Sequence, residues 1–505
     1  MKCHSILALS AVPAFGIAFG CADEEQRPNI LIAIADDQSY PYASAYGCGS
    51  VPTPAFDYVA SHGVLFENAY ATSPGSSPSR ASVLTGLYPW QLAEAGTHAS
   101  CFPARFTCFP DVFAEAGYLS GCTGKGWGPG DWKISGRTHN PAGPEYNEVK
   151  CEPPYSGISK IDYSANFEKF LDSRADGQPF CFWYGSHEPH RPYELDSWAR
   201  AGLDASDAQV PGFLPEADAV RGDIMDYAVE IGWFDRHLMS CIEILKERKL
   251  LDNTIIIVTA DNGMSFPHAK ANCYDAGVHV PLAVCWGDKI KGRRLESALV
   301  SLVDIFPTLL ELSGVKWDGT DFVGESLAPL LGLGDSSRRT SAVFSGRERH
   351  SCSRYDNLGY PVRSVRSGNY LLVHNFHPER WPAGDPLSLG KDGKARGEQE
   401  AYFDIDAAPS KTYLIAHRNE PSVRVFFDAA VAPRPEYELY NLVNDSACMV
   451  NVAGDPHYSD VLERMKVLLR ERLQETGDSR LGDNPEVWES YPRLEGKMRK
   501  FPKHE

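Results

Sequence analysis

The sequence predicts an α/β fold in which a mainly parallel central sheet lies between helices, followed by a smaller α+β unit with an antiparallel sheet. Short continuous apolar runs that end in polar residues, with helical patterns between them, predict the larger part. Such runs are typical of strands buried on both faces of a parallel sheet. From about residue 340 short alternating segments with turn residues take over. We therefore expect two domains, 21–340 and 341–505.

Three apolar runs are the candidate strands of the central sheet. They span residues 29–37 (NILIAIADD), 180–192 (FCFWYGSHEPHRP) and 253–263 (NTIIIVTADNG). The polar residues that close them are Asp36 and Asp37, His187 and His190, and Asp261 and Asn262. Ligands gather at the carboxyl ends of the strands in open sheets of this kind. We therefore expect these side chains to meet at one edge of the sheet.

Helical patterns separate the candidate strands. Residues 226–251 carry the apolar period of a long helix. Residues 73–90 (SPGSSPSRASVLTGLYPW) resemble a helix start, in which a serine caps the first amides and Ala81–Leu84 begin the helix.

The smaller unit has its own pattern. Short strands are predicted within residues 360–376 and 436–445, and an amphipathic helix within 457–476. The stretch 378–411 is rich in proline and glycine and is predicted to be irregular.

The first 20 residues predict export. Residues 1–20 combine Lys2 with an apolar stretch that is short and broken by Pro13 and Gly16, as in a signal peptide and not in a membrane span. The following Cys21 completes a loose lipoprotein box, which predicts a lipid anchor; a plain signal peptide is the alternative. We expect a periplasmic protein or a lipoprotein at the cell surface.

The net charge and the spacing of the cysteines argue against two classes of function, nucleic-acid binding and a cysteine zinc site. The net charge of −18 argues against binding to nucleic acid, but a few local cations could still hold an anionic substrate in one pocket. The 13 cysteines are scattered without the spacing of a zinc site. Cys101 and Cys108 could close a short loop as a disulfide.

The acidic strand ends predict a metal site. Asp36, Asp37, Asp261 and Asn262 offer only oxygen ligands, which suit a hard cation such as Ca²⁺ or Mg²⁺. Three carboxylates brought together would repel one another without a cation. The alternative for each pair is a turn or a helix cap.

The eleven residues from Ser76 to Gly86, S-S-P-S-R-A-S-V-L-T-G, closely resemble the signature of type I sulfatases in the alkaline phosphatase superfamily. Pro78, Arg80 and Thr85 also match it. The resemblance implies that Ser76 is converted to formylglycine (3-oxoalanine) by a serine-type maturase.

The resemblance continues along both predicted domains. Carried over by position, it implies that the converted residue 76 lies at a Ca²⁺ site formed by Asp36, Asp37, Asp261 and Asn262. Arg80 would orient the residue at 76. Sulfate would be bound by Lys125, His190 and Lys270. The hydrated aldehyde would attack sulfur, with His190 or Lys270 protonating the leaving atom.

One position departs from the family pattern. Many members have Lys-x-His where this chain has Lys125-Gly126-Trp127, and an indole cannot share a proton in that way. His98 or His139 could supply the missing histidine, although His98 could equally be an ordinary surface or core residue. Trp127 could instead be a stacking face for a sugar ring.

Several stretches most resemble the N-sulfoglucosamine sulfohydrolase (heparan N-sulfatase) branch of the family, among them SHEPHRP and TADNGMSFP. This favours a sulfated amino sugar or a related glycan such as a heparan-type glycosaminoglycan, with N-sulfate and O-sulfate both open. Arg347, Arg349 and His350 could reach the pocket from the smaller domain, but we expect them to form a solvated charge cluster.

Two rival functions remain open. A phosphate-monoester or phosphonate hydrolase of the same superfamily would use a similar metal site, and activity on aryl phosphate versus aryl sulfate would separate the two. A sugar-binding pseudoenzyme would follow if Ser76 is never modified, although the intact ligand set argues against it.

Overall fold

The computed structural model describes residues 26–319, 322–334, 340–494 and 498–502. The predicted signal peptide, residues 1–20, and the predicted lipid anchor at Cys21 lie outside the described residues. None of the described helices has both the length and the apolar character needed to cross a membrane.

The larger of the two main sheets has eight strands and confirms the α/β prediction. Seven of them follow the order β10-β2-β8-β7-β1-β6-β4, and β9 pairs with β2. The strands are β1 (Asn29–Ala35), β2 (Gly63–Tyr70), β4 (Leu119–Gly124), β6 (Phe180–Gly185), β7 (Thr254–Ala260), β8 (His279–Cys285), β9 (Arg294–Glu296) and β10 (Val300–Ser301). Among the described pairs only those made by β8 are antiparallel, so the sheet is mainly parallel, as predicted.

The three predicted strands are three neighbours at the centre of this sheet. They correspond to β1, β6 and β7, and every residue of all three is buried. Burial on both faces explains why their sequences are continuous apolar runs without alternation.

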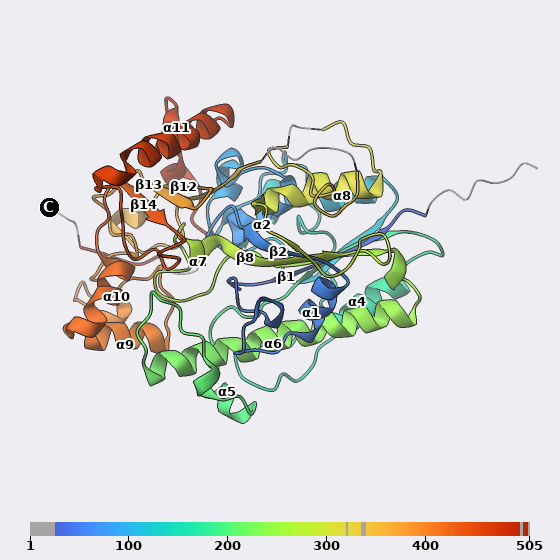
Figure 1. Cartoon of the computed structure of the whole chain (residues 1–505), viewed down its shortest axis with the longest axis horizontal. Helices are drawn as coiled ribbons and strands as arrows, with labels where there is room; N and C mark the ends of the chain where they lie inside the picture. The colour runs from blue at the N-terminus through green and yellow to red at the C-terminus, as the bar shows by residue number, and fades with distance from the viewer. Residues whose placement is uncertain (1–25, 320–321, 335–339, 495–497, 503–505) are drawn as a thin grey trace, which may run out of the picture.

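Helices cover both faces of the sheet. Figure 1 shows α1 (Pro54–Ser61), α4 (Tyr163–Asp172) and α6 (Asp218–Glu247) below it, with α2 (Ser76–Thr85) and α8 (Ile305–Ser313) above. The long helix α6 begins eight residues before the predicted start at 226. Its first turns bury Asp223 beside Arg191, and this polar core position interrupts the apolar period.

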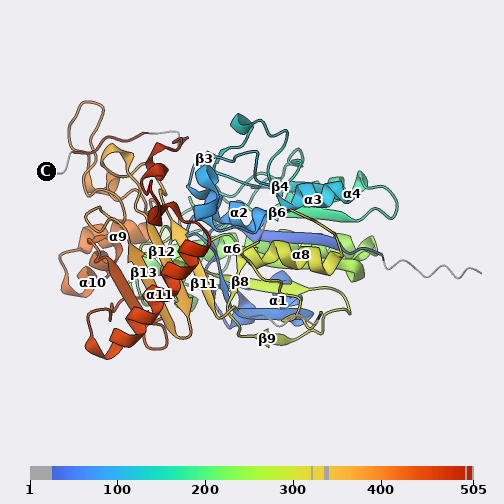
Figure 2. The ribbon, with the colours of Figure 1, turned by 90° about the horizontal axis from the view of Figure 1, so that it is seen from above.

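The second main sheet has four antiparallel strands, as predicted for the smaller unit. Its order is β11-β12-β13-β14, from β11 (Ala342–Arg347), β12 (Val362–Ser367), β13 (Tyr370–Asn375) and β14 (Tyr437–Asn441). The predicted helix is α11 (Ser459–Glu475), which lies across this sheet (Figure 2). The predicted irregular stretch ends in an unpredicted helix, α9 (Pro409–His417), and α10 (Pro421–Val431) follows it.

The remaining α-helices and strands of the described residues are short. They are α3 (Phe109–Glu115), α5 (Ser197–Arg200), α7 (Asp275–Val278), β3 (Ser100–Cys101) and β5 (Gly130–Asp131). Cys101, in β3, and Cys108 are both free thiols, so the disulfide considered between them is not formed.

The two sheets are joined directly ahead of α2. The hydroxyl of Ser345 in β11 donates to the carbonyl of Ala71 at 2.6 Å, and the amide of Gly346 donates to the carbonyl of Thr72 at 2.8 Å. The smaller unit is therefore fastened to the segment that leads into Ser76.

Candidate active site

The polar ends of four neighbouring strands form the candidate site. Strands β7, β1, β6 and β4 are adjacent and parallel, and the last residues of β1 and β7, Ala35 and Ala260, are paired in register. The residues that follow the four strands therefore lie along one edge of the sheet, as predicted. Strand β4 adds Lys125 to this edge.

Three buried carboxylates meet there. Oxygen atoms of Asp36, Asp37 and Asp261 all lie within 4.8 Å of one another, and the three residues are at most 1% exposed. The amide of Asn262 donates to Asp37 Oδ1 at 2.7 Å. A set of oxygen donors this close together fits a hard divalent cation such as Ca²⁺.

Ser76 lies against this cluster. Its hydroxyl donates to Asp36 Oδ1 at 2.9 Å, and Asn262 Oδ1 is 3.4 Å away. The expectation of a serine cap is wrong, because Ser76 is the first residue of α2 and Gly75 is its N-cap, with no side-chain cap hydrogen bond. The start of a helix places unpaired amides and positive potential beside this side chain.

Three cations surround the carboxylates, and two of them, Arg80 and Lys270, are buried. Arg80 Nε lies 2.7 Å from Asp261, and Lys270 Nζ lies 2.6 Å from Asp37. Lys125 Nζ lies 2.5 Å from Asp36 and donates to Ser76 Oγ at 3.1 Å. Four predicted site residues, Ser76, Arg80, Lys125 and Lys270, are thus brought to the acidic cluster.

Neighbouring charges shift the pKa values of Asp36 and Lys270. Burial alone would raise the pKa of Asp36, but positive charge on Lys125, His190 and Arg80 outweighs burial and lowers this pKa well below its usual range. Burial would lower the pKa of Lys270, yet the neighbouring carboxylates, above all Asp37, raise it. Both groups are therefore charged at neutral pH.

His190 is the most accessible member of the predicted set. Its side chain is 38% exposed, and its Nε2 lies 3.9 Å from Asp37 Oδ2. Its Nδ1 lies 2.6 Å from the carbonyl oxygen of Arg191, which requires the proton to be on Nδ1. In the neutral ring Nε2 is therefore a proton acceptor that faces the site.

A cavity of about 620 Å³ opens above the cluster. Its lining includes Asp36, Lys125, His187 and His190, together with His98. The cavity has the volume of a small-ligand site.

Trp127 is not a stacking face for a ligand, contrary to one expectation. It is only 3% exposed, its Nε1 donates to the carbonyl of Ser77 at 2.9 Å, and its ring packs against Phe102. Of the two histidines considered as replacements, His98 lines the cavity. His139 instead lies 3.5 Å from Asp111, and the cavity lining does not include it.

The expectation of a solvated cluster at Arg347, Arg349 and His350 is wrong, because all three residues are buried. Arg347 pairs with Asp404 inside the smaller unit. The ring of His350 lies 4.6 Å from that of His98, and burial lowers its pKa to about 4. These residues form part of the wall where the two units meet.

Sequence reasoning missed one carboxylate. Asp406 Oδ2 lies 3.3 Å from Lys270 Nζ and accepts a hydrogen bond from the hydroxyl of Ser265 at 2.5 Å. Asp406 belongs to the irregular stretch before α9, where no periodic pattern marks individual residues.

Comparison with known proteins decides the family. The sulfatase family model matches residues 28–315, more than half of the chain. The chain belongs to the sulfatase family. The sequence-based assignment is thereby confirmed.

The sulfatase relatives extend over both units. Human N-sulphoglucosamine sulphohydrolase is 26% identical over 489 residues, covering 90% of this chain and 91% of the relative. An ulvan-active sulfatase of Formosa agariphila is 25% identical, covering 90% and 76%. An N-acetylglucosamine-6-O-sulfatase of Bacteroides thetaiotaomicron is 24% identical, covering 75% and 84%.

Solved structures share the sulfatase fold. One, a complex with its substrate D-glucosamine-2-N,6-O-disulfate, has a TM-score of 0.64 at 19% identity, covering 91% of this chain and 99% of that one. The phosphonate monoester hydrolase of Agrobacterium radiobacter has a TM-score of 0.62 at 20% identity, covering 90% and 97%. The fold alone therefore does not separate the two reactions.

Proposed function

We propose that this protein hydrolyses a sulfate group from a sulfated saccharide, with Ser76 converted to formylglycine as the nucleophile. The observation that carries the proposal is the position of the Ser76 side chain. It lies at the start of a helix and contacts Asp36, Asn262 and Lys125. A side chain there faces both a cation site and the positive groups that an anionic substrate needs.

The charge balance favours a sulfate ligand beside a bound metal ion. Three carboxylates are paired with Arg80, Lys125 and Lys270. A divalent cation held by Asp36, Asp37, Asp261 and Asn262, with the residue at 76, would leave the site with an excess of positive charge. Sulfate esters and sulfamates carry the negative charge that neutralises this excess. We propose Ca²⁺ as the cation, which would stabilise charge on the sulfate oxygens.

The chemistry follows from the groups around residue 76. Converted to formylglycine and hydrated, residue 76 would supply a geminal diol. One hydroxyl would attack sulfur as the bond from sulfur to the sugar oxygen or nitrogen breaks. The other would then lose its proton, so that the C–O bond to the sulfate breaks and the aldehyde reforms. Lys125 lies close enough to orient the residue at 76. Arg80 Nη2 makes no hydrogen bond within the described residues and lies 3.9 Å from Asp36 Oδ1.

His190 in its imidazolium form, with protons on both ring nitrogens, is the proposed proton donor to the leaving atom, through Nε2. Its Nε2 faces the site, its side chain is exposed to the cavity, and its other nitrogen is fixed by the carbonyl of Arg191. Lys270 is buried and held by Asp37, so it suits charge stabilisation of the bound sulfate better than proton transfer.

The relatives support a sulfated amino sugar as the substrate class. Two of those compared above act, by name, on sulfated glucosamine derivatives. Hydrolysis of an N-sulfate and of an O-sulfate both remain within the proposal.

The test compares substrates on protein made together with a serine-type maturase. We expect turnover of N- or 6-O-sulfated glucosamine and of an aryl sulfate, with aryl phosphate turned over at least about 100-fold more slowly in kcat/KM. Preference for aryl phosphate or a phosphonate ester would instead assign the phosphonate-hydrolase reaction. Binding of sulfated sugar without turnover would assign the sugar-binding alternative.

We also propose that the protein is exported through residues 1–20 and anchored by lipid at Cys21. Cell fractionation of the wild type and of Cys21→Ser tests this, with release of the variant from the membrane fraction as the expected result.

A further inference from the structure

Asp406 is held in place by its neighbours in the chain. Asp404, two residues before it, lies 2.5 Å from Arg354 and accepts from the hydroxyl of Ser351 at 2.6 Å. Lys411, five residues after it, donates to the carbonyls of Ala401 and Ile405 at 2.8 and 3.0 Å. The short segment 401–411 is therefore fixed although it contains almost no regular structure.

The carboxylate of Asp406 lies next to the sulfatase site. Its Oδ2 contacts Lys270 Nζ at 3.3 Å and Ser265 Oγ at 2.5 Å. Burial would raise its pKa, but the positive charges of Lys270 and His190, with the Ser265 hydrogen bond, lower it below its usual range. Asp406 is therefore negatively charged at neutral pH, although it lies beside cations suited to binding an anion.

This anion is accessible. The Asp406 side chain is 33% exposed, against 5% for Lys270, and no described residue donates a hydrogen bond to its Oδ1. Lys270 is already neutralised by Asp37 at the shorter distance of 2.6 Å. Pairing with Lys270 therefore does not account for a partly exposed carboxylate next to a residue proposed to bind sulfate.

We propose that Asp406 determines substrate specificity by accepting a hydrogen bond from a hydroxyl or amino group of the sugar that carries the sulfate. The inference rests on the proposed function. The carboxylate would repel inorganic anions and favour a substrate whose sulfate has a hydrogen-bond donor nearby. A site built to pair with such a donor rejects analogues that lack it, since the acceptor is then left without a partner.

The test compares Asp406→Ala and the isosteric Asp406→Asn on two substrates. We expect kcat/KM for sulfated glucosamine to fall about 10- to 100-fold in Asp406→Ala, and less in Asp406→Asn, which keeps an acceptor. We expect kcat/KM for an aryl sulfate, which lacks the sugar donors, to stay within about threefold. Asp428→Ala is the matched control, because Asp428 is an exposed acid on α10 paired with Arg424.

Equal losses on both substrates in both variants would overturn the inference, because Asp406 would then act only by positioning Lys270 or by holding the fold. Unchanged turnover of the sugar would also overturn it. Failure of the wild-type protein on both substrates would refute the proposed function itself. Melting temperatures of both variants identify a folding defect, and Asp406→Asn, which conserves shape, then gives the decisive comparison.

Discussion

The hydroxyl of Ser76 combines three structural features of the candidate site. It contacts a candidate metal ligand, Asp36, and a cation, Lys125, and Ser76 is itself the first residue of α2. Neighbouring serines of the same helix lack this combination. Ser82, for example, donates only to the carbonyl of Pro78 in its own helix.

Ser76→Ala should abolish sulfatase activity, by at least about 1,000-fold in kcat, because no nucleophile can be formed at position 76. Ser82→Ala, a buried serine of the same helix, should keep activity within about twofold. The measurement is kcat on an aryl sulfate, with the melting temperature as a folding control. Substantial activity in Ser76→Ala would contradict the assignment of the nucleophile.

Among single residues, the sequence predicted the place of the acidic strand ends correctly but not that of Asp406 or Trp127. Asp36 and Asp261 directly follow apolar strands, so a local pattern marks them. Asp406 meets Lys270 across 136 residues of sequence, and that contact exists only because the two units pack together. Trp127 was misjudged because its burial depends on Phe102 and the start of α2, which no spacing reveals.

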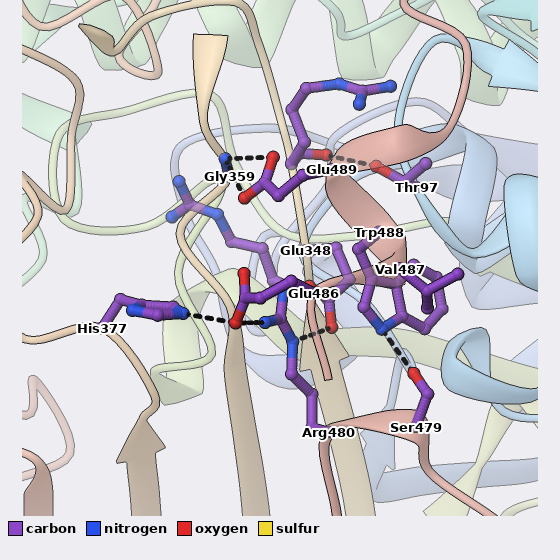
Figure 3. A network of polar contacts seen from close by, with 12 residues as sticks. Thr97, Glu348, Gly359, His377, Ser479, Arg480, Glu486, Val487, Trp488 and Glu489 are labelled. Carbon is purple, nitrogen blue, oxygen red and sulfur yellow. Dashed lines mark hydrogen bonds and ion pairs between the residues drawn. The ribbon is translucent and has the colours of Figure 1, made fainter. Parts of the chain in front are cut away.

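Among the elements, the C-terminal segment after α11 is held by a polar network whose central pair, Arg480 and Glu348, is buried. Figure 3 shows Arg480 between Glu348 and Glu486, with His377 reaching Glu486 from the other side. Trp488 donates to Ser479 within the same segment. Glu348 immediately precedes Arg349, whose carbonyl accepts the amide of His98, so this network adjoins the wall of the cavity.

Arg480→Met should lower the free energy of unfolding by about 3 kcal/mol, because it leaves Glu348 buried with one cation fewer. Arg480 is 1% exposed in its side chain and lies 2.6 Å from Glu348. Arg424→Met breaks an exposed pair and should cost less than about 0.5 kcal/mol. Urea unfolding measures both, and equal small effects would show that the buried network adds no stability.

The packing of α6 against α4 should make stability sensitive to acid. His237 on α6 accepts from the amide of Ser164 at 3.4 Å, and burial lowers its pKa to about 4. The unfolded chain has an ordinary histidine pKa of about 6.5 and so takes up a proton first as pH falls. The contribution of His237 to the free energy of unfolding is therefore full above about pH 6.5 and is lost as the pH falls from about 6.5 to 4.

The expected loss in the free energy of unfolding is about 3 kcal/mol between pH 6.5 and pH 4. His237→Gln keeps a neutral acceptor and should remove this part of the pH dependence of unfolding, while His457→Gln at an exposed site should not. Unfolding curves at pH 7 and pH 4.5 make the comparison. If the free energy of unfolding of His237→Gln fell between pH 7 and pH 4.5 as much as that of the wild type, the assignment of a neutral histidine would be contradicted.

Helices and strands were predicted correctly where the local apolar pattern is strong. Strands β1, β6 and β7 and helix α11 were found, because their apolar periods are uninterrupted. The start of α6 was missed, since Asp223 is a polar residue buried beside Arg191. Helix α9 was missed because it begins inside the proline- and glycine-rich stretch 378–411, which was predicted to be irregular.

At the scale of the whole molecule, the acidic cluster should couple metal binding to stability. Ca²⁺ should raise the melting temperature and a chelator should lower it, with about 2.7 kcal/mol of added stability at 100 times Kd. Asp261→Asn should abolish most of the shift, because it removes a buried carboxylate from the cluster. The absence of any shift with Ca²⁺ or Mg²⁺ would contradict a hard-cation site.

The central claim is that Ser76 is converted to the nucleophile of a sulfatase. The most direct measurement is mass spectrometry of the peptide that carries Ser76, from protein made together with a serine-type maturase. We expect a residue two hydrogens lighter than serine that is captured by an aldehyde reagent. Serine left entirely unmodified under those conditions, in protein that still hydrolyses sulfated sugar, would contradict it.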